Sequence, residues 1–340
     1  MKMIKWLSVL ACFAIGLVTG NMAHAAPTHF SVTAIIPNNQ IDKRQTYFDL
    51  RMVPKQTQTI QVRIDNISDQ KITVIPSIIN ATTTLYGDIN YTDKHAKMDE
   101  SMKFPLTSIV KQVRPVTLNG RESRLLPLKL VMPEEKQNGV ILGSIHFIEK
   151  NNSTVETQKH PAVLVQNQYA YVIGLKLTEG TAVQPDLHFN SIKKQTLNNQ
   201  KIVSVNIQNS RPVIVHDLSV KTRLMKAGSE KILQSSIRKN MRMAPNSNFD
   251  LPIIRNLASL HPGKYVVHLS AEANGQSWKA DRTFVIKGDE AAPPHRLSPG
   301  APFYKWLGGA VFIVCIAVIF YLLGKRQRKS KREKKGRTNK

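Results

Sequence analysis

The run Thr59-Ile60-Gln61-Val62-Arg63-Ile64-Asp65 decides the fold class of this 340-residue chain. Apolar and polar residues alternate strictly through it, which is the period of a β-strand with one face buried and the other in water. A turn-like stretch follows at residues 66–70, and Lys71-Ile72-Thr73-Val74 then resumes the alternation. These two runs predict a β-hairpin.

The same pattern extends over most of the chain and is interrupted by a polar stretch at residues 151–160, which we take as a domain boundary. Further strands are predicted at Phe30–Ile35, Tyr47–Val53, Leu125–Val131, Val140–Ile148, Val163–Leu177, Ile202–Gln208, Val213–Leu224, Phe249–Ile253, Tyr265–Ala271 and Phe284–Ile286. Short helical connections are predicted at Ser108–Val113 and Arg255–Leu260. The pattern therefore predicts an all-β protein of two tandem immunoglobulin-like β-sandwich domains, residues 28–150 and 160–287.

The beginning of the chain carries an export signal. Two lysines precede the apolar run Leu7–Thr19, and the small residues Ala23-His24-Ala25 follow it. This is the layout of a secretory signal peptide, residues 1–25, cleaved between Ala25 and Ala26. An uncleaved membrane anchor is the alternative, but the shortness of the apolar run favours cleavage.

Near the other end, Trp306–Leu323 is an uncharged run of eighteen residues. Ten Lys and Arg against one Glu follow in the last sixteen residues, a block that stays cytoplasmic. We therefore predict one transmembrane helix at residues 304–324 and a basic cytoplasmic tail at residues 325–340. The proline-rich residues 288–303 are predicted to form a stiff stalk. The protein is thus expected in the cell membrane as a single-pass protein with both sandwiches outside.

Residue types that carry chemistry do not converge in the sequence. Cys12 and Cys315 lie in the two apolar end segments, and the histidines are dispersed without the spacing of zinc ligands. No nucleophile elbow or phosphate-binding glycine loop is present. Asp88–Asp93 begins like a calcium loop but lacks the glycine at the sixth place and the glutamate at the twelfth. We therefore predict no catalytic, cofactor or metal site and no enzyme activity, and the ligand-binding residues stay unassigned.

Charge favours anionic partners. The formal net charge is +25, of which residues 26–324 carry +14. Such a surface attracts anionic groups over long range. Nucleic acid is disfavoured as a partner, because the densest basic run directly follows the apolar segment and contains no aromatic residue for base stacking.

Several short motifs occur in a fixed order along the chain. They are Phe30-Ser31-Val32, Pro37–Gln40, Tyr47–Leu50, Thr59–Asn66, Gly143-Ser144-Ile145, Tyr169–Leu175, Met243–Phe249, Leu260–Tyr265, Trp278 and Phe284–Ile286. Together they resemble the WxL-interacting protein family of Gram-positive bacteria. The chain departs from the family at Pro54-Lys55-Gln56, usually Pro-Gly-Gln, and at Thr83-Thr84 before Gly87, usually Thr-Asn.

The resemblance implies a first domain that binds peptidoglycan and a second that binds host matrix or partner proteins, in a complex with secreted WxL-domain proteins. Lys and Arg side chains would then meet stem-peptide carboxylates and anionic cell-wall polymers. The interpretation is a membrane-anchored cell-surface scaffold or adhesin. One alternative is a chaperone-like factor that assists the assembly of surface proteins, because sandwich folds also support that role. A stalk-mounted enzyme that modifies the cell wall is the other alternative, and the missing site signatures disfavour it.

Overall fold

The computed structural model describes residues 28–111, 113–150, 169–254, 257 and 260–288. The predicted signal peptide with its cleavage point at Ala25 and Ala26, nearly all of the stalk, the transmembrane helix and the basic tail lie outside these residues. Among the described residues, no helix is long and apolar enough to cross a membrane. The strands belong, except for outermost residues of the last two, to the larger of two compact units, Met1–Arg255 with Lys264–Val285.

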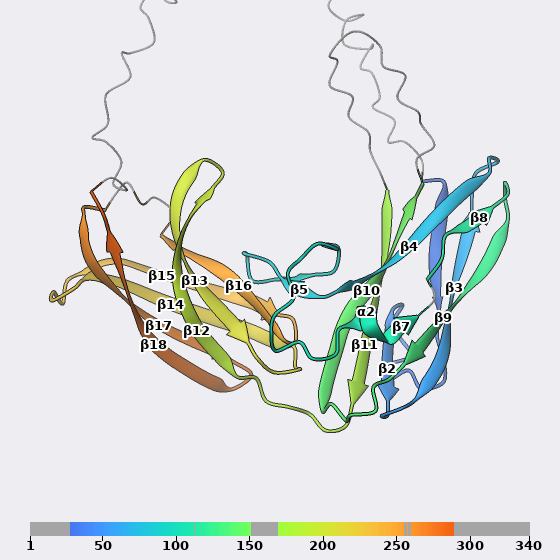
Figure 1. Cartoon of the computed structure of the whole chain (residues 1–340), viewed down its shortest axis with the longest axis horizontal. Helices are drawn as coiled ribbons and strands as arrows, with labels where there is room; N and C mark the ends of the chain where they lie inside the picture. Colours follow the sequence, from blue (N-terminus) through green and yellow to red (C-terminus); the bar gives the residue numbers. More distant parts are fainter. Residues whose placement is uncertain (1–27, 112, 151–168, 255–256, 258–259, 289–340) are drawn as a thin grey trace, which may run out of the picture. The chain divides into compact units, whose positions relative to one another are not determined.

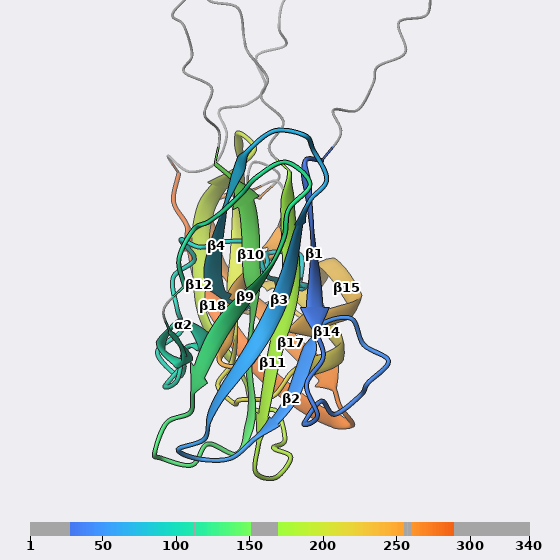
Figure 2. The ribbon, with the colours of Figure 1, turned by 90° about the vertical axis from the view of Figure 1, so that its right-hand side faces the viewer.

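Two sheets with one shared apolar core make up what we call the first half, residues 28–150 and 169–179. One sheet has the order β1 (Phe30–Ile35), β3 (Thr57–Asn66), β9 (Ser123–Val131), β7 (Val110–Lys111). The other has the order β2 (Phe48–Met52), β11 (Ala170–Glu179), β10 (Gly139–Glu149), β4 (Ile72–Asn80), β8 (Val116–Leu118). Figure 2 shows β1, β3 and β9 side by side, in agreement with their antiparallel pairing.

The alternation at residues 59–65 places Ile60, Val62 and Ile64 in this core, while Gln61 and Arg63 are exposed. The all-β prediction is confirmed, but the predicted hairpin is wrong. Strand β3 pairs with β1 and β9, whereas β4 pairs with β10 and β8 in the other sheet.

The side chain of Asn66 explains why the chain changes sheets after β3. Its Nδ2 donates hydrogen bonds to the carbonyl oxygens of Gln70 and Asn119, both at 2.7 Å. These bonds fix the connection that carries the chain across the core instead of back along β3. Ile72 and Val74 then enter the same core from the opposite sheet.

Strand β11 completes the first half, although the sequence analysis assigned residues 160–287 to the second domain. It pairs antiparallel with β10 from Gly139↔Glu179 to Ile148↔Ala170, and parallel with β2. Residues 170–179 therefore lie in a sheet of the first half.

The second half, residues 180–288, contains another two sheets. The three-stranded sheet has the order β12 (Leu187–Leu197), β13 (Gln200–Asn209), β16 (Ser247–Ile254). The four-stranded sheet has the order β15 (Ile232–Met243), β14 (Val215–Lys226), β17 (Gly263–Ala273), β18 (Gln276–Ile286). Their inner faces bury Val205, Ile207, Val220 and Leu269.

The strands β12 and β15 and the first eight residues of β18 were not predicted from the sequence. These are outer strands of their sheets, and most of the side chains of β15 are exposed whichever way they point. An alternation of buried and exposed residues therefore has no reason to appear in β15. Of the predicted helical connections, α2 (Leu106–Ile109) is observed at one, and the other is only partly described.

One segment leaves the first half between β4 and α2. This segment, residues 81–105, is called the docking segment here and carries the two-stranded sheet of β5 (Thr82–Thr83) and β6 (Ile89–Asn90). Figure 1 shows β5 in this segment, where the chain has left β4.

Candidate functional site

A cleft of about 500 Å³ lies on the outer face of the sheet that contains β10 and β11. On β11, Ile173 and Leu175 point into the core, so the alternate residues of the strand point outward. Val172, Gly174 and Lys176 therefore form the floor of the cleft.

Gly174 makes this floor flat. A Cβ atom placed on it would lie 3.6 Å from the Cβ of Tyr47 and 3.7 Å from its ring atoms, which is ordinary van der Waals contact. The ring of Tyr47 therefore lies beside Gly174, and 36% of Tyr47 is exposed. An exposed aromatic ring beside an open floor can pack against an apolar sugar face.

Tyr91 and Ile89 of the docking segment form a second wall. The hydroxyl of Ser144 on β10 donates to the carbonyl oxygen of Tyr91 at 2.5 Å, and Ile89 packs with Leu142 and Ala244. Burial raises the pKa of Tyr91, and burial together with nearby carboxylates raises the pKa of Tyr47. Both phenols therefore stay neutral at physiological pH and can donate or accept hydrogen bonds.

Two cationic side chains line the cleft, and each forms an ion pair with a carboxylate. Lys176 Nζ lies 3.2 Å from Oδ2 of Asp49, a side chain that is only 8% exposed. Arg242 pairs with Asp88 at 2.6 Å, and this hydrogen bond lowers the pKa of Asp88. His216 lies on the same lining without an ion-pair partner among the described residues. The cleft thus combines aromatic faces, fixed polar groups and little excess charge, which suits a polar, weakly charged ligand.

The docking segment is tied to the second half through several direct hydrogen bonds. The Thr83 hydroxyl lies 2.6 Å from the Ser247 hydroxyl and accepts from the backbone amide of Ala244 at 3.0 Å. The amide of Arg242 donates to the carbonyl of Gly87 at 2.8 Å. Because Tyr91 belongs to this segment, the same bonds position the wall of the cleft.

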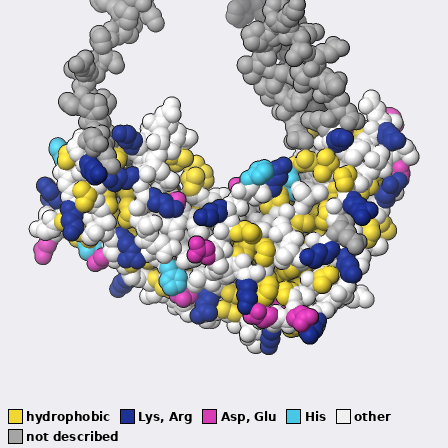
Figure 3. Space-filling view, viewed as in Figure 1, with side chains coloured by type: hydrophobic (Ala, Val, Ile, Leu, Met, Phe, Trp, Pro, Cys, Tyr) yellow, Lys and Arg dark blue, Asp and Glu magenta, His cyan; other side chains and the backbone are white. Residues whose placement is uncertain are grey.

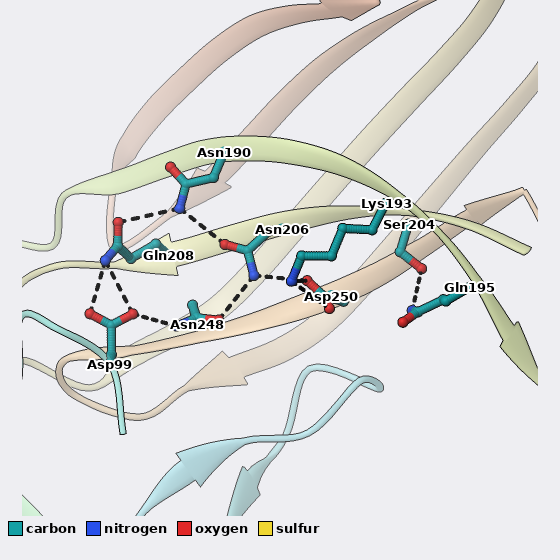
Figure 4. A network of polar contacts seen from close by, with 9 residues as sticks. All are labelled: Asp99, Asn190, Lys193, Gln195, Ser204, Asn206, Gln208, Asn248 and Asp250. Carbon is teal, nitrogen blue, oxygen red and sulfur yellow. Dashed lines mark hydrogen bonds and ion pairs between the residues drawn. The ribbon is translucent and has the colours of Figure 1, made fainter. Parts of the chain in front are cut away.

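A polar network extends this attachment along the outer face of the three-stranded sheet (Figure 4). The carboxylate of Asp99 accepts from Gln208 Nε2 at 2.9 and 3.1 Å, and also from Asn248 Nδ2. Burial raises the pKa of Asp99, but hydrogen bonds from Ser101, Asn248 and Gln208 outweigh it and leave the pKa below its ordinary value of 3.8. The network continues through Asn190, Asn206, Asp250 and Lys193.

Two glycines allow the chain to approach this closely. Gly87 has a φ of +74°, and a Cβ there would lie 2.5 Å from the sulfur of Met241. Gly139 has a φ of +114°, and a Cβ there would lie 2.2 Å from the carbonyl oxygen of Pro212. Any other residue would be strained at both positions and would also push the contact apart.

The calcium-like stretch at Asp88–Asp93 is a set of polar turns. The carboxylate of Asp88 accepts hydrogen bonds from the side chain of Arg242 and from the backbone amide of Ile89. Asp93 accepts a hydrogen bond from the backbone amide of His95 at 2.9 Å. No group of three or more potential metal ligands occurs among the residues that the structure describes.

Sequence reasoning left the ligand-binding residues unassigned, and the cleft explains why. Its lining comes from Thr46 and Tyr47 just before β2, from β10 and β11, from the docking segment and from the second half, which are far apart in the chain. One local signal was available, since Gly174 lies inside β11, and a glycine inside a strand marks a place where something approaches the backbone closely.

Solved structures of low sequence identity resemble the chain only distantly. The E. coli chaperone DraB is 14% identical, with 76% of this chain and 97% of that chain covered and a TM-score of 0.28. A chain of the Salmonella enterica SafA pilin complex with the SafB chaperone is 12% identical, with 77% and 99% covered and a TM-score of 0.28. These scores carry no argument about function. No match was found among curated proteins.

Family models match two successive segments. Residues 30–149 match the peptidoglycan binding domain of WxL Interacting Protein, and residues 161–293 match its host binding domain. Both are binding domains, and together they span well over half of the chain. The chain belongs to the WxL-interacting protein family.

Proposed function

We propose that this protein is a cell-surface scaffold that holds peptidoglycan in the cleft, most of whose lining belongs to the first half, and partner proteins with its second half. The cleft carries the proposal, because its aromatic walls, Tyr47 and Tyr91, belong to the segment that matches a peptidoglycan binding domain. Its floor on β11 belongs to the next matched segment, the host binding domain. Glycan strands present sugar rings with apolar faces and many hydroxyl groups. Two neutral tyrosines and a flat glycine floor suit such a ligand.

Filling the cleft tests this assignment. Gly174→Leu introduces a side chain where a Cβ meets only ordinary contacts, so the strand should still form while the floor is occupied. In co-sedimentation of the full chain with peptidoglycan stripped of anionic polymers, we expect affinity to fall about tenfold, or about 1.4 kcal/mol. Tyr47→Ala should lower the affinity as well, because it removes an aromatic wall.

Two matched controls separate the cleft from general effects. Gly288→Leu makes the same change at a position with no neighbouring atom within 4 Å, and Tyr86→Ala removes a tyrosine that is 66% exposed outside the cleft. Both should bind peptidoglycan as the unchanged protein does. If the cleft variants bind equally well while remaining folded, the cleft is not the peptidoglycan site.

The partners and the membrane anchor complete the proposal. The name of the second matched domain supports binding of host or surface proteins, and secreted WxL-domain proteins are the proposed companions. The sequence supports two immunoglobulin-like domains at 28–150 and 160–287 and a single membrane helix at residues 304–324. Protease added to intact cells should then remove both domains, and their survival would contradict this orientation.

A further inference from the structure

The four-stranded sheet of the second half has an outer face rich in cations. On β14, Val220, Thr222 and Leu224 are buried, so Lys221 and Arg223 point outward. Residues paired across strands share a face. Lys221 is paired with Ser270 of β17 and Arg223 with His268.

The neighbouring strand β18 adds Lys279 to the same face. The turn between β17 and β18 consists of Asn274 and Gly275, with φ values of +51° and +75°, as a tight two-residue hairpin requires. Counting outward from this turn places Lys279 opposite Ser270. The observed hydrogen bond of 2.6 Å between His268 and Asp281 agrees with this register.

Lys221, Arg223 and Lys279 therefore form a cluster that we call the basic stripe. Neighbouring strands lie about 4.8 Å apart, which puts Lys221 and Lys279 about 10 Å apart, and Lys221 and Arg223 are about 7 Å apart along one strand. Lys264 of β17 lies on the same outer face. None of these cations has an acidic partner among the residues that the structure describes.

Acidic residues do not neutralise the stripe. Asp281 lies on this face but is engaged by His268, and Glu272 lies at the end of β17 beside Ser219. Residues 180–288 as a whole carry 16 Lys and Arg against 6 Asp and Glu. Figure 3 shows Lys and Arg side chains spread over the face in view.

We propose that the basic stripe binds a linear polymer with repeating phosphate or sulfate groups. Cations spaced 7–10 Å apart on a flat face can each meet a different charge of such a chain. A folded protein partner would require a desolvated apolar centre. The exposed large apolar side chains of this sheet lie on its two edge strands, with Ile232, Leu233 and Ile237 on β15 and Val285 on β18. Ile237 is paired with Lys221, but the described residues of the central strands β14 and β17 include no exposed large apolar side chain. This inference does not depend on the cleft.

The test compares two triple variants with the same change in net charge. The stripe variant is Lys221→Gln, Arg223→Gln and Lys279→Gln. The control is Arg63→Gln, Arg121→Gln and Arg124→Gln, which removes three exposed, ion-paired cations of the first half. Binding of the full chain to inorganic polyphosphate, heparin and poly-L-glutamate is measured at several salt concentrations, with thermal unfolding as the folding check.

We expect the stripe variant to lose at least about tenfold in affinity for polyphosphate or heparin near 0.15 M salt, and the slope of log K against log salt to fall by about 2. The control should change less than about threefold. Preference for polyphosphate identifies a phosphodiester polymer of the wall type, and preference for heparin a sulfated glycan. Equal losses in both variants, no binding of either polymer, or tighter binding of poly-L-glutamate would overturn the proposal.

Discussion

The first half of the chain carries 17 Lys and Arg against 13 Asp and Glu, whereas the second half carries 16 against only 6. Among the described residues, ion pairs within the first half engage Arg44, Lys55, Arg63, Lys103, Arg121, Arg124 and Lys176. In the second half, Lys193 pairs with Asp250, but the basic stripe has no such partners.

This difference separates two modes of recognition. Where charges are balanced, long-range attraction largely cancels, and shape, aromatic faces and hydrogen bonds select the ligand, as proposed for the cleft. Where cations are in excess, a field extends about one Debye length into solution and attracts anions before contact. Four changes of charged residues test how far the two halves differ.

The largest effect is expected at the buried pair of Lys176 and Asp49. Lys176→Met leaves a carboxylate that is almost inaccessible without its cation, and Oδ1 of Asp49 already lacks a hydrogen-bond partner. The free energy of unfolding, measured with urea, should fall by about 3 kcal/mol. Adding Asp49→Asn to this variant should recover part of the loss.

The control for this pair is Lys55→Met. Lys55 lies 3.4 Å from Glu134, and both side chains are more than two-thirds exposed. The same chemical change should alter stability by less than about 0.5 kcal/mol. Equal losses in the two variants would show that burial does not distinguish the pairs.

A smaller effect is expected at Asp99, where the docking segment meets the amide network. Asp99→Ala should destabilise the protein by about 2 kcal/mol, because it removes several hydrogen bonds to a charged group. Asp93→Ala, in an exposed turn of the same segment, is the control. Hydrogen exchange of the docking segment should accelerate in the first variant only.

The pH dependence of this contact follows from the lowered pKa of Asp99. In the unfolded chain the carboxyl has its ordinary pKa of 3.8, and the folded state holds it lower. Its contribution is therefore complete well above pH 3.8 and is lost as the pH falls through the folded-state value. Hydrogen exchange of residues 81–105 measured below pH 4 should show this loss, and Asp99→Ala should abolish the additional change.

The contribution of Glu179 to stability changes with pH in the opposite direction to that of Asp99, and a smaller effect on stability is expected. It is 2% exposed, and burial raises its pKa, which the amide of Gln137 and the charge of Lys136 only partly offset. The native state therefore binds this proton more tightly than the unfolded chain, so the contribution of Glu179 to stability falls as the pH rises above 4.5. Glu179→Gln should stabilise the protein at pH 7 by about 1 kcal/mol. A loss of stability at pH 7 would contradict this account.

The smallest effect is expected at an unpaired cation of the second half. Arg223→Gln should change the free energy of unfolding by less than about 0.5 kcal/mol, because no carboxylate depends on Arg223 for its charge balance. At low salt it should stabilise slightly by relieving repulsion, and added salt should remove that gain. A loss above about 1 kcal/mol, seen by urea unfolding, would reveal a partner that the structure does not show.

The sequence predicted local features well and non-local ones poorly. The alternation at residues 59–65 depends only on which side chains meet the core, and it predicted β3 correctly. The partner of β3 depends on Asn66 reaching Asn119, 53 residues away, and no local pattern contains that information. The cleft is non-local too, because Tyr47, Tyr91 and Arg242 meet only after folding.

The most direct test of the account measures both kinds of binding in both kinds of variant. Full-length protein carrying Gly174→Leu or the triple change of the basic stripe is assayed against stripped peptidoglycan and against polyphosphate. We predict a crossed result, in which Gly174→Leu loses peptidoglycan alone and the stripe variant loses polyphosphate alone. Loss of both ligands in either folded variant would contradict the claim that the two halves recognise different chemistry.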